Sequence, residues 1–324
     1  MAENDFPALP VISLEKLNVH DAEKGAMAVD VSLTAKVDSP IAITIPPLAF
    51  EVLVPNCSPG DPLIMVANAS TAEVLVRTNA PTDVNALGLI KKIPDELTSS
   101  CPGERDSPLD LLVSNFIQGQ ETTIFVRGAD PPLPETPDWI ADILRSVTVP
   151  LPFTGHALDD LVKNFTMTDA HFSLPDPFAD PKTPAGQPSV SAIMKVVIGL
   201  PKEMNFNVEV PRVRAIANVY YQGDQLGVLD INEWQNSNST MTEDEDGSAA
   251  LLVEFAIKDA PLEVTDSGVL SEVVQQLIFG GNTVILHVAA TVDTKVSTGL
   301  GRLTVRGIPA SGDVPVNSMF SMIS

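Results

Sequence analysis

Histidine is the residue type in this sequence best suited to proton transfer near neutral pH, and the chain holds four. They are His20, His156, His171 and His287. His287 lies among apolar residues of a predicted strand, which favours a structural role. His156 and His171 fall in or near a predicted interdomain segment, where packing or surface roles are favoured. The histidines therefore give no strong indication of an acid–base centre.

Sequence motifs of known catalytic sites are absent from the chain. It contains no HExxH zinc motif, no GxSxG nucleophile elbow and no GxxxxGK[ST] phosphate loop. Gly299-Leu300-Gly301 is a fragment of a dinucleotide-binding fingerprint, and no helix is predicted after it. Carboxylates are numerous enough for a glycosidase pair, but the aromatic content of 5% is low for a sugar-binding cleft. We expect a protein that is not an enzyme and needs no cofactor, with a hydrolase of acidic compartments as the minor alternative.

The residues also give little support for a metal site. Cys57 and Cys101 are the two cysteines, 44 residues apart, and no histidine lies near them at zinc-ligand spacing. The acidic run from Glu243 to Gly247 is expected to be a solvated hairpin tip, because calcium loops need spaced ligands and a distal glutamate. The cysteines form either a disulfide or two buried thiols. The N-terminus carries no export signal, which favours the thiols.

Four Asn-x-Ser/Thr sequons begin at Asn56, Asn68, Asn164 and Asn238. They matter only if the chain enters a secretory compartment. No run of 18 apolar residues occurs, so the chain itself is not expected to span a membrane. From its residues alone it is expected to be soluble.

The net charge is strongly negative, at −23, with 19 basic and 42 acidic side chains. This charge excludes direct nucleic-acid binding through basic phosphate contacts and docking on anionic lipid through a polybasic patch. A hydrophobic content of 44% is sufficient for packed cores. The 28 prolines, spread along the chain, favour short strands with proline corners over a helical bundle.

An amphipathic helix is predicted twice, at an offset of 161 residues. In the first copy Ser107 is a suitable N-cap, Pro108 starts the helix and Gly119 ends it. Its apolar stripe is Leu109, Leu112, Val113, Phe116 and Ile117. The second copy repeats the stripe and the glycine as Leu270, Val273, Val274, Leu277, Ile278 and Gly280. A strand is predicted after each glycine, so the chain is expected to be a tandem duplication.

Alternation with period two dominates the rest of the sequence, as in residues 27–37 and 204–210. A strand, a proline corner and a second strand recur from residues 43–52 to 208–217. The predicted fold is mainly β, with two tandem immunoglobulin- or fibronectin-like antiparallel β-sandwiches, each with one short amphipathic helix. The predicted division is a first repeat over 1–130, a proline-rich linker with a short helix over 131–160, a second repeat over 161–312 and a tail over 313–324.

Several phrases of the sequence resemble known families. Residues 37–52 resemble the strand signature of late-embryogenesis-abundant type-2 domains. Longer phrases are similar to the C-terminal part of a fungal family of large vacuolar membrane proteins. These phrases are residues 45–57, 146–153, 171–177, 213–219, and 221–227 with 234–235. One member of that family is linked to termination of autophagy, and members are often labelled pre-rRNA processing proteins.

The resemblance implies a fold of late-embryogenesis-abundant type-2 kind and a location on the lumenal side of the fungal vacuolar membrane. In that family a cytosolic tail and one transmembrane helix precede the lumenal domains, and the sequence given lacks that helix. A lumenal location implies a Cys57–Cys101 disulfide and glycans on Asn68, Asn164 and Asn238. Asn56 is a poor acceptor because its neighbour Cys57 would be paired.

Two functions are therefore expected from the sequence. The first is a non-catalytic interaction or sensing array, whose partners are proteins or other repeats of the same array. The second is a lipid-binding or lipid-transfer module, in which the helices after Ser107 and Ser267 act as lids over an acyl chain. Pre-rRNA processing is a minor alternative and would have to act through partners, because the charge of the chain repels RNA.

Overall fold

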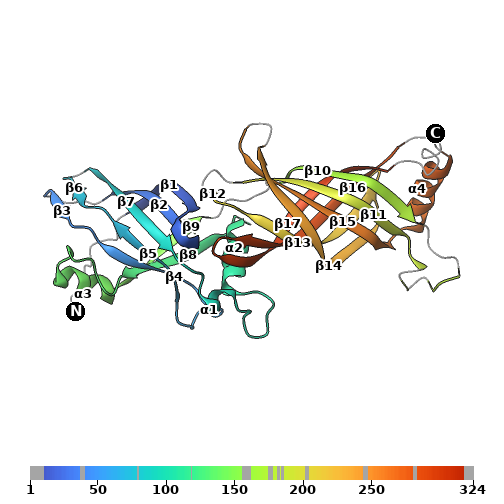
Figure 1. Cartoon of the computed structure of the whole chain (residues 1–324). Coiled ribbons are helices and arrows are strands. Elements are labelled where there is room, and N and C mark those ends of the chain that lie inside the picture. Colours follow the sequence, from blue (N-terminus) through green and yellow to red (C-terminus); the bar gives the residue numbers. More distant parts are fainter. Residues whose placement is uncertain are drawn as a thin grey trace, which may run out of the picture.

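The computed structural model describes residues 11–36, 41–78, 80–117, 119–154, 162–173, 178–180, 183, 186–200, 204–243, 247–279 and 283–316. The chain is mostly β, and its strands form two antiparallel units that lie one after the other (Figure 1). Few helices accompany them. This β-sandwich-like architecture confirms the predicted fold class.

The first unit is built on a sheet of seven of its own strands. They are β1 (Val11–Asp21), β2 (Met27–Lys36), β4 (Ala49–Val54), β5 (Ile64–Thr71), β7 (Pro81–Ile90), β8 (Glu121–Gly128) and β9 (Thr148–Thr154). A separate ladder joins β3 (Ile43–Ile45) to β6 (Val74–Val76). The helical elements are η1 (Glu23–Gly25), α1 (Asp95–Thr98), α2 (Pro108–Ile117) and α3 (Asp138–Ser146).

The second unit has longer strands around a larger core. Its seven-stranded sheet contains β10 (Val162–Ser173), β11 (Ser189–Gly199), β13 (Glu209–Tyr221), β14 (Asp224–Glu243), β15 (Ala249–Val264), β16 (Val284–Thr298) and β17 (Gly301–Val316). The helix α4 (Ser267–Phe279) lies between β15 and β16 in the sequence. The short strand β12 (Met204–Asn205) leaves this unit and pairs in parallel with β1, so it extends the first sheet.

The two units share one topology. The first sheet has the order β1-β2-β7-β5-β4-β8-β9 after β12, and the second has β10-β11-β15-β14-β13-β16-β17. When the seven sheet strands of each unit are numbered along the chain, without β3, β6 and β12, both orders read 1-2-5-4-3-6-7. In both units the principal helix, α2 or α4, connects the fifth strand to the sixth. An identical order with an equivalent helix is what a tandem duplication predicts.

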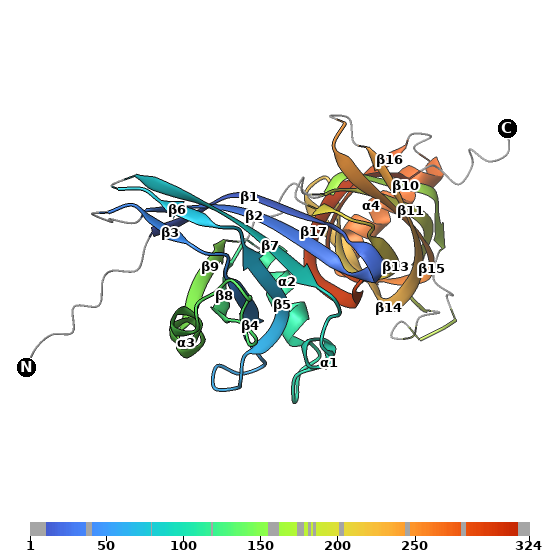
Figure 2. The same cartoon turned by 60° about the vertical axis from the view of Figure 1, so that its left-hand side comes forward.

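The second unit wraps its sheet around its interior (Figure 2). A register shift between Leu229 and Ser237 divides β14 into a part that pairs mainly with β13 and a part that pairs with β15. Inward side chains from all the long strands and α4 meet in one buried cluster, with Leu226, Leu262 and Leu277 almost fully buried. The first unit has a smaller cluster of buried residues beside α1 and α2.

Two of the predicted boundaries need correction. Residues 148–154, which the proline content assigned to the linker, form β9 and pair with β8 from Thr148 opposite Arg127 onward. Prolines are tolerated there because β9 is an edge strand, whose outer N–H groups have no ladder partner. The second repeat extends beyond residue 312, since β17 continues to Val316 and buries Val314 and Val316. The short helix predicted within 131–160 is confirmed as α3.

Both predicted amphipathic helices are present, as α2 and α4. Gly119 follows α2 with a φ of 70°, the left-handed conformation that favours glycine at the end of a helix. Its N–H donates to the carbonyl oxygen of Phe116 at 3.2 Å. Gly280 lies outside the described residues. Within the ranges described, no helix combines the length and apolar character needed to cross a membrane.

A glycine substitution tests how tightly the second sheet is packed. A Cβ atom at Gly227 would lie 2.5 Å from the carbonyl oxygen of Glu263 on the adjacent strand. We predict that Gly227→Ala lowers the free energy of unfolding by about 1–3 kcal/mol, because backbone must move to relieve the clash. Urea denaturation of the purified variant measures this loss. Gly60→Ala is the matched control, since no atom lies within 4 Å of its added Cβ, and an equal loss in both would contradict the packing argument.

Candidate functional site: an apolar cavity in the second unit

The interior of the second unit holds an apolar cavity of about 100 Å³. All seven long strands and α4 contribute to its wall. The wall follows from the period-two alternation, which sends every second side chain of a strand inward. On β13 these inward residues are Val213, Ala215, Ala217 and Val219. Six residue steps at about 3.3 Å give this stretch of wall a length of roughly 20 Å.

A row of alanines forms part of the wall. Ala217 on β13 lies opposite Ala290 on β16, and Ala290 lies opposite Ala310 on β17. All three line the cavity. Three short side chains in register across adjacent strands leave a groove in the wall, where larger residues would fill the core.

Polar groups are scarce in the described lining and lie near opposite ends of it. Thr294 is 4% exposed and belongs to the end nearer the first unit, whereas His171 is exposed on β10 near the end closed by α4. The helix closes that end with Val273 and Leu277, which are 1% and 2% exposed. The Asp266 carboxylate caps the helix by accepting the N–H groups of Gly268 and Val269 at 2.7 and 3.2 Å. The described lining is therefore suited to hydrocarbon and contains no carboxylate, lysine or arginine.

The helix predicted after Ser107, α2, lies at the contact between the two units and not at the cavity. The N-terminus of α2 is closed by two reciprocal bonds: the Asp110 N–H donates to Ser107 Oγ at 3.1 Å, and the Ser107 N–H donates to Asp110 Oδ2 at 3.2 Å. The second oxygen, Asp110 Oδ1, accepts the backbone N–H of Thr304 on β17 at 2.8 Å. The Asp110 carboxylate is 7% exposed, so one buried group both caps α2 and holds the second unit.

Apolar and charged contacts surround this junction. Leu300 and Leu303 of the second unit pack against the cluster that includes Leu97 and Leu109. Arg306 on β17 forms an ion pair with Asp106 of the first unit and reaches Asp293 at 3.4 Å. Asp293 also accepts from Arg214 Nη2 at 2.7 Å. The α2 helix thus lies between the units and is not part of the cavity lining, whereas α4 closes one end of the cavity.

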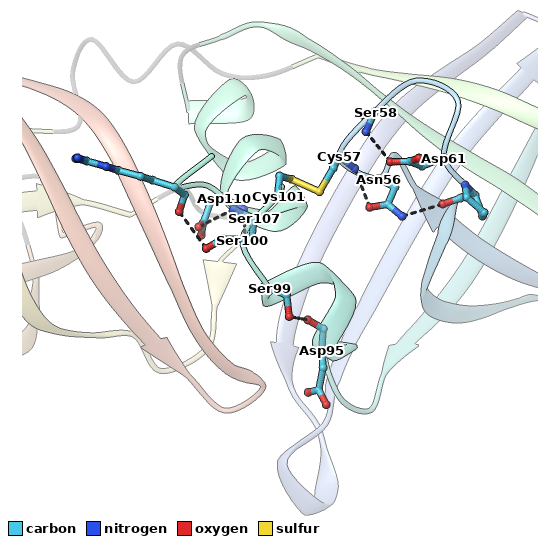
Figure 3. The surroundings of a disulfide bond; sticks show 12 residues. Asn56, Cys57, Ser58, Asp61, Asp95, Ser99, Ser100, Cys101, Ser107 and Asp110 are labelled. Atoms are coloured by element: carbon cyan, nitrogen blue, oxygen red, sulfur yellow. Dashed lines mark hydrogen bonds between the residues drawn. A yellow bond between two sulfur atoms is a disulfide. The ribbon is translucent and has the colours of Figure 1, made fainter. Parts of the chain in front are cut away.

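A disulfide joins Cys57 and Cys101 close to this junction (Figure 3). It ties the loop after β4 to the segment between α1 and α2. Closing a loop of 44 residues stabilises a fold by about 4 kcal/mol in the chain-entropy description. The Asn56 side chain is occupied, since its Nδ2 donates to the Pro62 carbonyl oxygen at 3.3 Å and its Oδ1 accepts the Cys57 N–H at 2.7 Å.

The three glycan candidates lie on exposed parts of strands. Asn68 is on β5, Asn164 on β10 and Asn238 on β14, and each side chain is exposed. Their exposure leaves the side-chain amides open to modification, and their glycosylation stays a prediction.

The histidines do not come together in a catalytic arrangement among the residues described. His20 Nε2 lies 3.1 Å from Asp30, and His287 Nδ1 lies 2.8 Å from Asp313, with both pairs on the surface. His156 falls outside the described residues. No group of three histidine, cysteine or carboxylate side chains within the described ranges is arranged to hold a metal ion. In the acidic run, Glu243 ends β14, and residues 244–246 lie outside the described part of the chain.

Comparison with known proteins gives a match to one domain model and one similar protein. Residues 204–317 match the model of the Tag1 C-terminal domain, which covers β12 to β17 and α4. The chain is also similar to the uncharacterized protein YLR173W of Saccharomyces cerevisiae, with 24% identity over 336 residues. The alignment covers 94% of this chain and 53% of the yeast protein, so the chain spans about half the length of that relative.

Replacing Asp110 tests the junction. We predict that Asp110→Ala lowers the free energy of unfolding by about 2–4 kcal/mol, because it removes a helix cap and leaves the Thr304 N–H without an acceptor. Urea denaturation gives the stability, and hydrogen exchange at Thr304 reports the local bond. Glu104→Ala, an exposed change on the same segment, is the control and is expected to leave both unchanged. Unaltered exchange at Thr304 in Asp110→Ala would refute the assigned role.

Proposed function

We propose that this chain is a non-catalytic binding module whose second unit holds the hydrocarbon chain of a lipid. The observation that carries the proposal is the apolar cavity, which runs between the inward faces of seven strands and the buried side of α4. A hydrocarbon chain gains free energy when it leaves water for such a site, by about 0.8 kcal/mol for each buried CH₂ group. An enzyme would need reacting groups aimed into the cavity, and its described lining supplies little beyond hydrocarbon.

The lipid proposal is favoured over a purely structural role for this core. Interiors of proteins are normally packed to the density of organic crystals. The Ala217–Ala290–Ala310 row instead sets three short side chains side by side on β13, β16 and the edge strand β17, in a wall whose other lining residues are mostly larger. Space maintained by three aligned alanines is what a site for a flexible apolar guest requires.

A second candidate function is docking of protein partners or of other repeats on the first unit. It is favoured by α3, where Trp139 and Ile143 are 66% and 55% exposed. These residues are four positions apart and therefore share one face of the helix. Exposed large apolar side chains on one face are typical of interaction surfaces. Loss of a copurifying protein in Trp139→Ser, but not in Asp138→Ser, would support this role; equal recovery would remove it.

We also propose that the module lies on the lumenal side of the fungal vacuolar membrane, as part of a membrane protein linked to regulation of autophagy. Support comes from the sequence resemblance, from the match of residues 204–317 to the Tag1 C-terminal domain, and from the disulfide, since disulfides persist in oxidising compartments. The exposed asparagines Asn68, Asn164 and Asn238 are compatible with that location. Direct RNA processing is disfavoured by the net charge of −23.

The lumenal location makes a prediction about glycans. Protein purified from a fungal host is expected to migrate faster on a gel after treatment with an endoglycosidase. The variant with Asn68→Gln, Asn164→Gln and Asn238→Gln is expected to show no such shift, and Asn56→Gln is expected to shift like the unmodified sequence. An absence of any shift, together with two free thiols in the purified protein, would overturn the lumenal assignment.

Filling the cavity tests the lipid proposal. We predict that Ala290→Phe weakens binding of the fluorescent fatty acid cis-parinaric acid by about tenfold or more, since the ring occupies the alanine row. Ala289→Phe is the matched control, because strand alternation puts the adjacent side chain on the other face of β16 and it does not line the cavity, and it is expected to bind within about twofold of the unmodified protein.

A second measurement complements the binding experiment. Native mass spectrometry of the purified protein is expected to show a copurified lipid that Ala290→Phe lacks. The proposal fails if the unmodified protein neither carries a lipid nor binds the probe. It also fails if Ala290→Phe binds the probe as well as Ala289→Phe does.

A further inference from the structure

The cavity as it stands is too small for the guest that its lining favours. Its volume is about 100 Å³, less than the roughly 150 Å³ of an engineered apolar cavity that takes up benzene. A complete acyl chain therefore requires part of the wall to move outward. The question is which part of the wall moves with the least loss of native contacts.

Most of the wall is held by backbone ladders. The strands β16 and β17, for example, pair from Val284 opposite Val316 to Thr298 opposite Gly301. Parting any such pair would break a long series of hydrogen bonds and leave their groups unsatisfied. The end closed by α4 is also costly to open, because Val269, Val273 and Leu277 are all buried there.

One line along the wall is different. The strands β10 and β17 are the two edges of the sheet, and both contribute lining residues, among them Phe165 and Ala310. They meet through side chains, as the Phe165 ring lies over Gly312: a Cβ atom at Gly312 would be 2.9 Å from Phe165 Cδ1. No ladder between β10 and β17 is found within the described residues. Parting these edges costs the contact of side chains and preserves the other ladders.

The first unit shows that this topology tolerates separate edges. Its equivalent edge strands are β1 and β9. In the first unit β1 pairs with β12, a strand of the second unit, and not with the opposite edge strand β9. The same strand order therefore exists in this chain without closure of its first strand on its last.

From these observations we propose that the seam between β10 and β17 is the lateral opening through which a single-chain lipid enters the cavity, with the Phe165 ring as its gate on Gly312. This inference rests on the lipid-binding function proposed above. The described lining contains no carboxylate, lysine or arginine, so the polar head stays at the seam. The outward residues there are polar and exposed: Asn164, Thr166 and Thr168 on β10, and Ser311 on β17.

The geometry allows the seam to be locked. A Cβ at Gly312 would lie 3.4 Å from the Cβ of Phe165, close to the 3.5–4.5 Å at which disulfides form. The variant carrying both Phe165→Cys and Gly312→Cys is therefore expected to cross-link under mild oxidation. Peptide mass mapping distinguishes this bond from Cys57–Cys101, which is far away in the first unit.

Uptake of cis-parinaric acid by the locked protein is the decisive measurement. We predict that the rate constant for uptake falls by about tenfold or more in the oxidised variant and recovers after reduction. The variant carrying Phe165→Ala and Gly312→Ala, treated with the same oxidant and reductant, is the control and is expected to load at least as fast as the unmodified protein. Equal rates in the locked and reduced forms would overturn the seam as the opening, while leaving lipid binding in place.

Two other outcomes are informative. If the unmodified protein does not bind the probe at all, lipid binding and the seam fail together. Hydrogen exchange on the unmodified protein tests the seam without any variant: the amides of β10 and β17 that face each other are expected to exchange faster than those of the central strand β13. Protection at the seam equal to that of β13 would also overturn the proposal.

Discussion

The carboxylate of Asp110 is the interaction on which the arrangement of the two units depends. One of its oxygens closes the first turn of α2 with Ser107, and the other accepts the Thr304 N–H from β17. A buried carboxylate without partners would be costly, and here each oxygen has a backbone donor. The helix start in one unit and the strand position in the other are thereby fixed by one side chain. The Arg306–Asp106 ion pair and the leucines around α1 and α2 add further contacts between the two units.

The strand β17 links this junction to the cavity. Its first residues hold the contact with α2, and its later residues, Ile308 to Val316, line the interior of the second unit. A rigid strand therefore runs from the interface with the first unit to the edge that meets β10. The disulfide between Cys57 and Cys101 steadies the other side of the same junction, because it fixes the segment that precedes α2 (Figure 3). The junction between the units and the cavity of the second unit are therefore connected through β17.

Much of the fold was predictable from local patterns, because helix caps and apolar stripes are short-range signals. Ser107, the stripe after it and Gly119 predict α2 correctly, and the matching stripe predicts α4. The linker assignment of residues 148–154 was wrong, because prolines on an edge strand resemble those of a linker. The alanine row could not be predicted from the sequence, because Ala217 and Ala290 are 73 positions apart and only the pairing of β13 with β16 aligns them. The capping role of Asp110 could be inferred from its position three residues after Ser107, which is the spacing of a capping box. Its hydrogen bond to the Thr304 N–H could not be inferred, because Thr304 is distant in the sequence.

Two copies of one topology in a single chain allow natural selection to act on them separately. A substitution in the interior of one unit leaves the surface of the other unit unchanged. In this chain the second copy encloses the cavity, and the first copy presents α2 and the edge of β1 to its neighbour. The inward alanines of the second copy and the capping residues of the first are thus constrained for different reasons. A tandem duplication, which the shared strand order supports, would allow the alanines of one unit and the capping residues of the other to change independently.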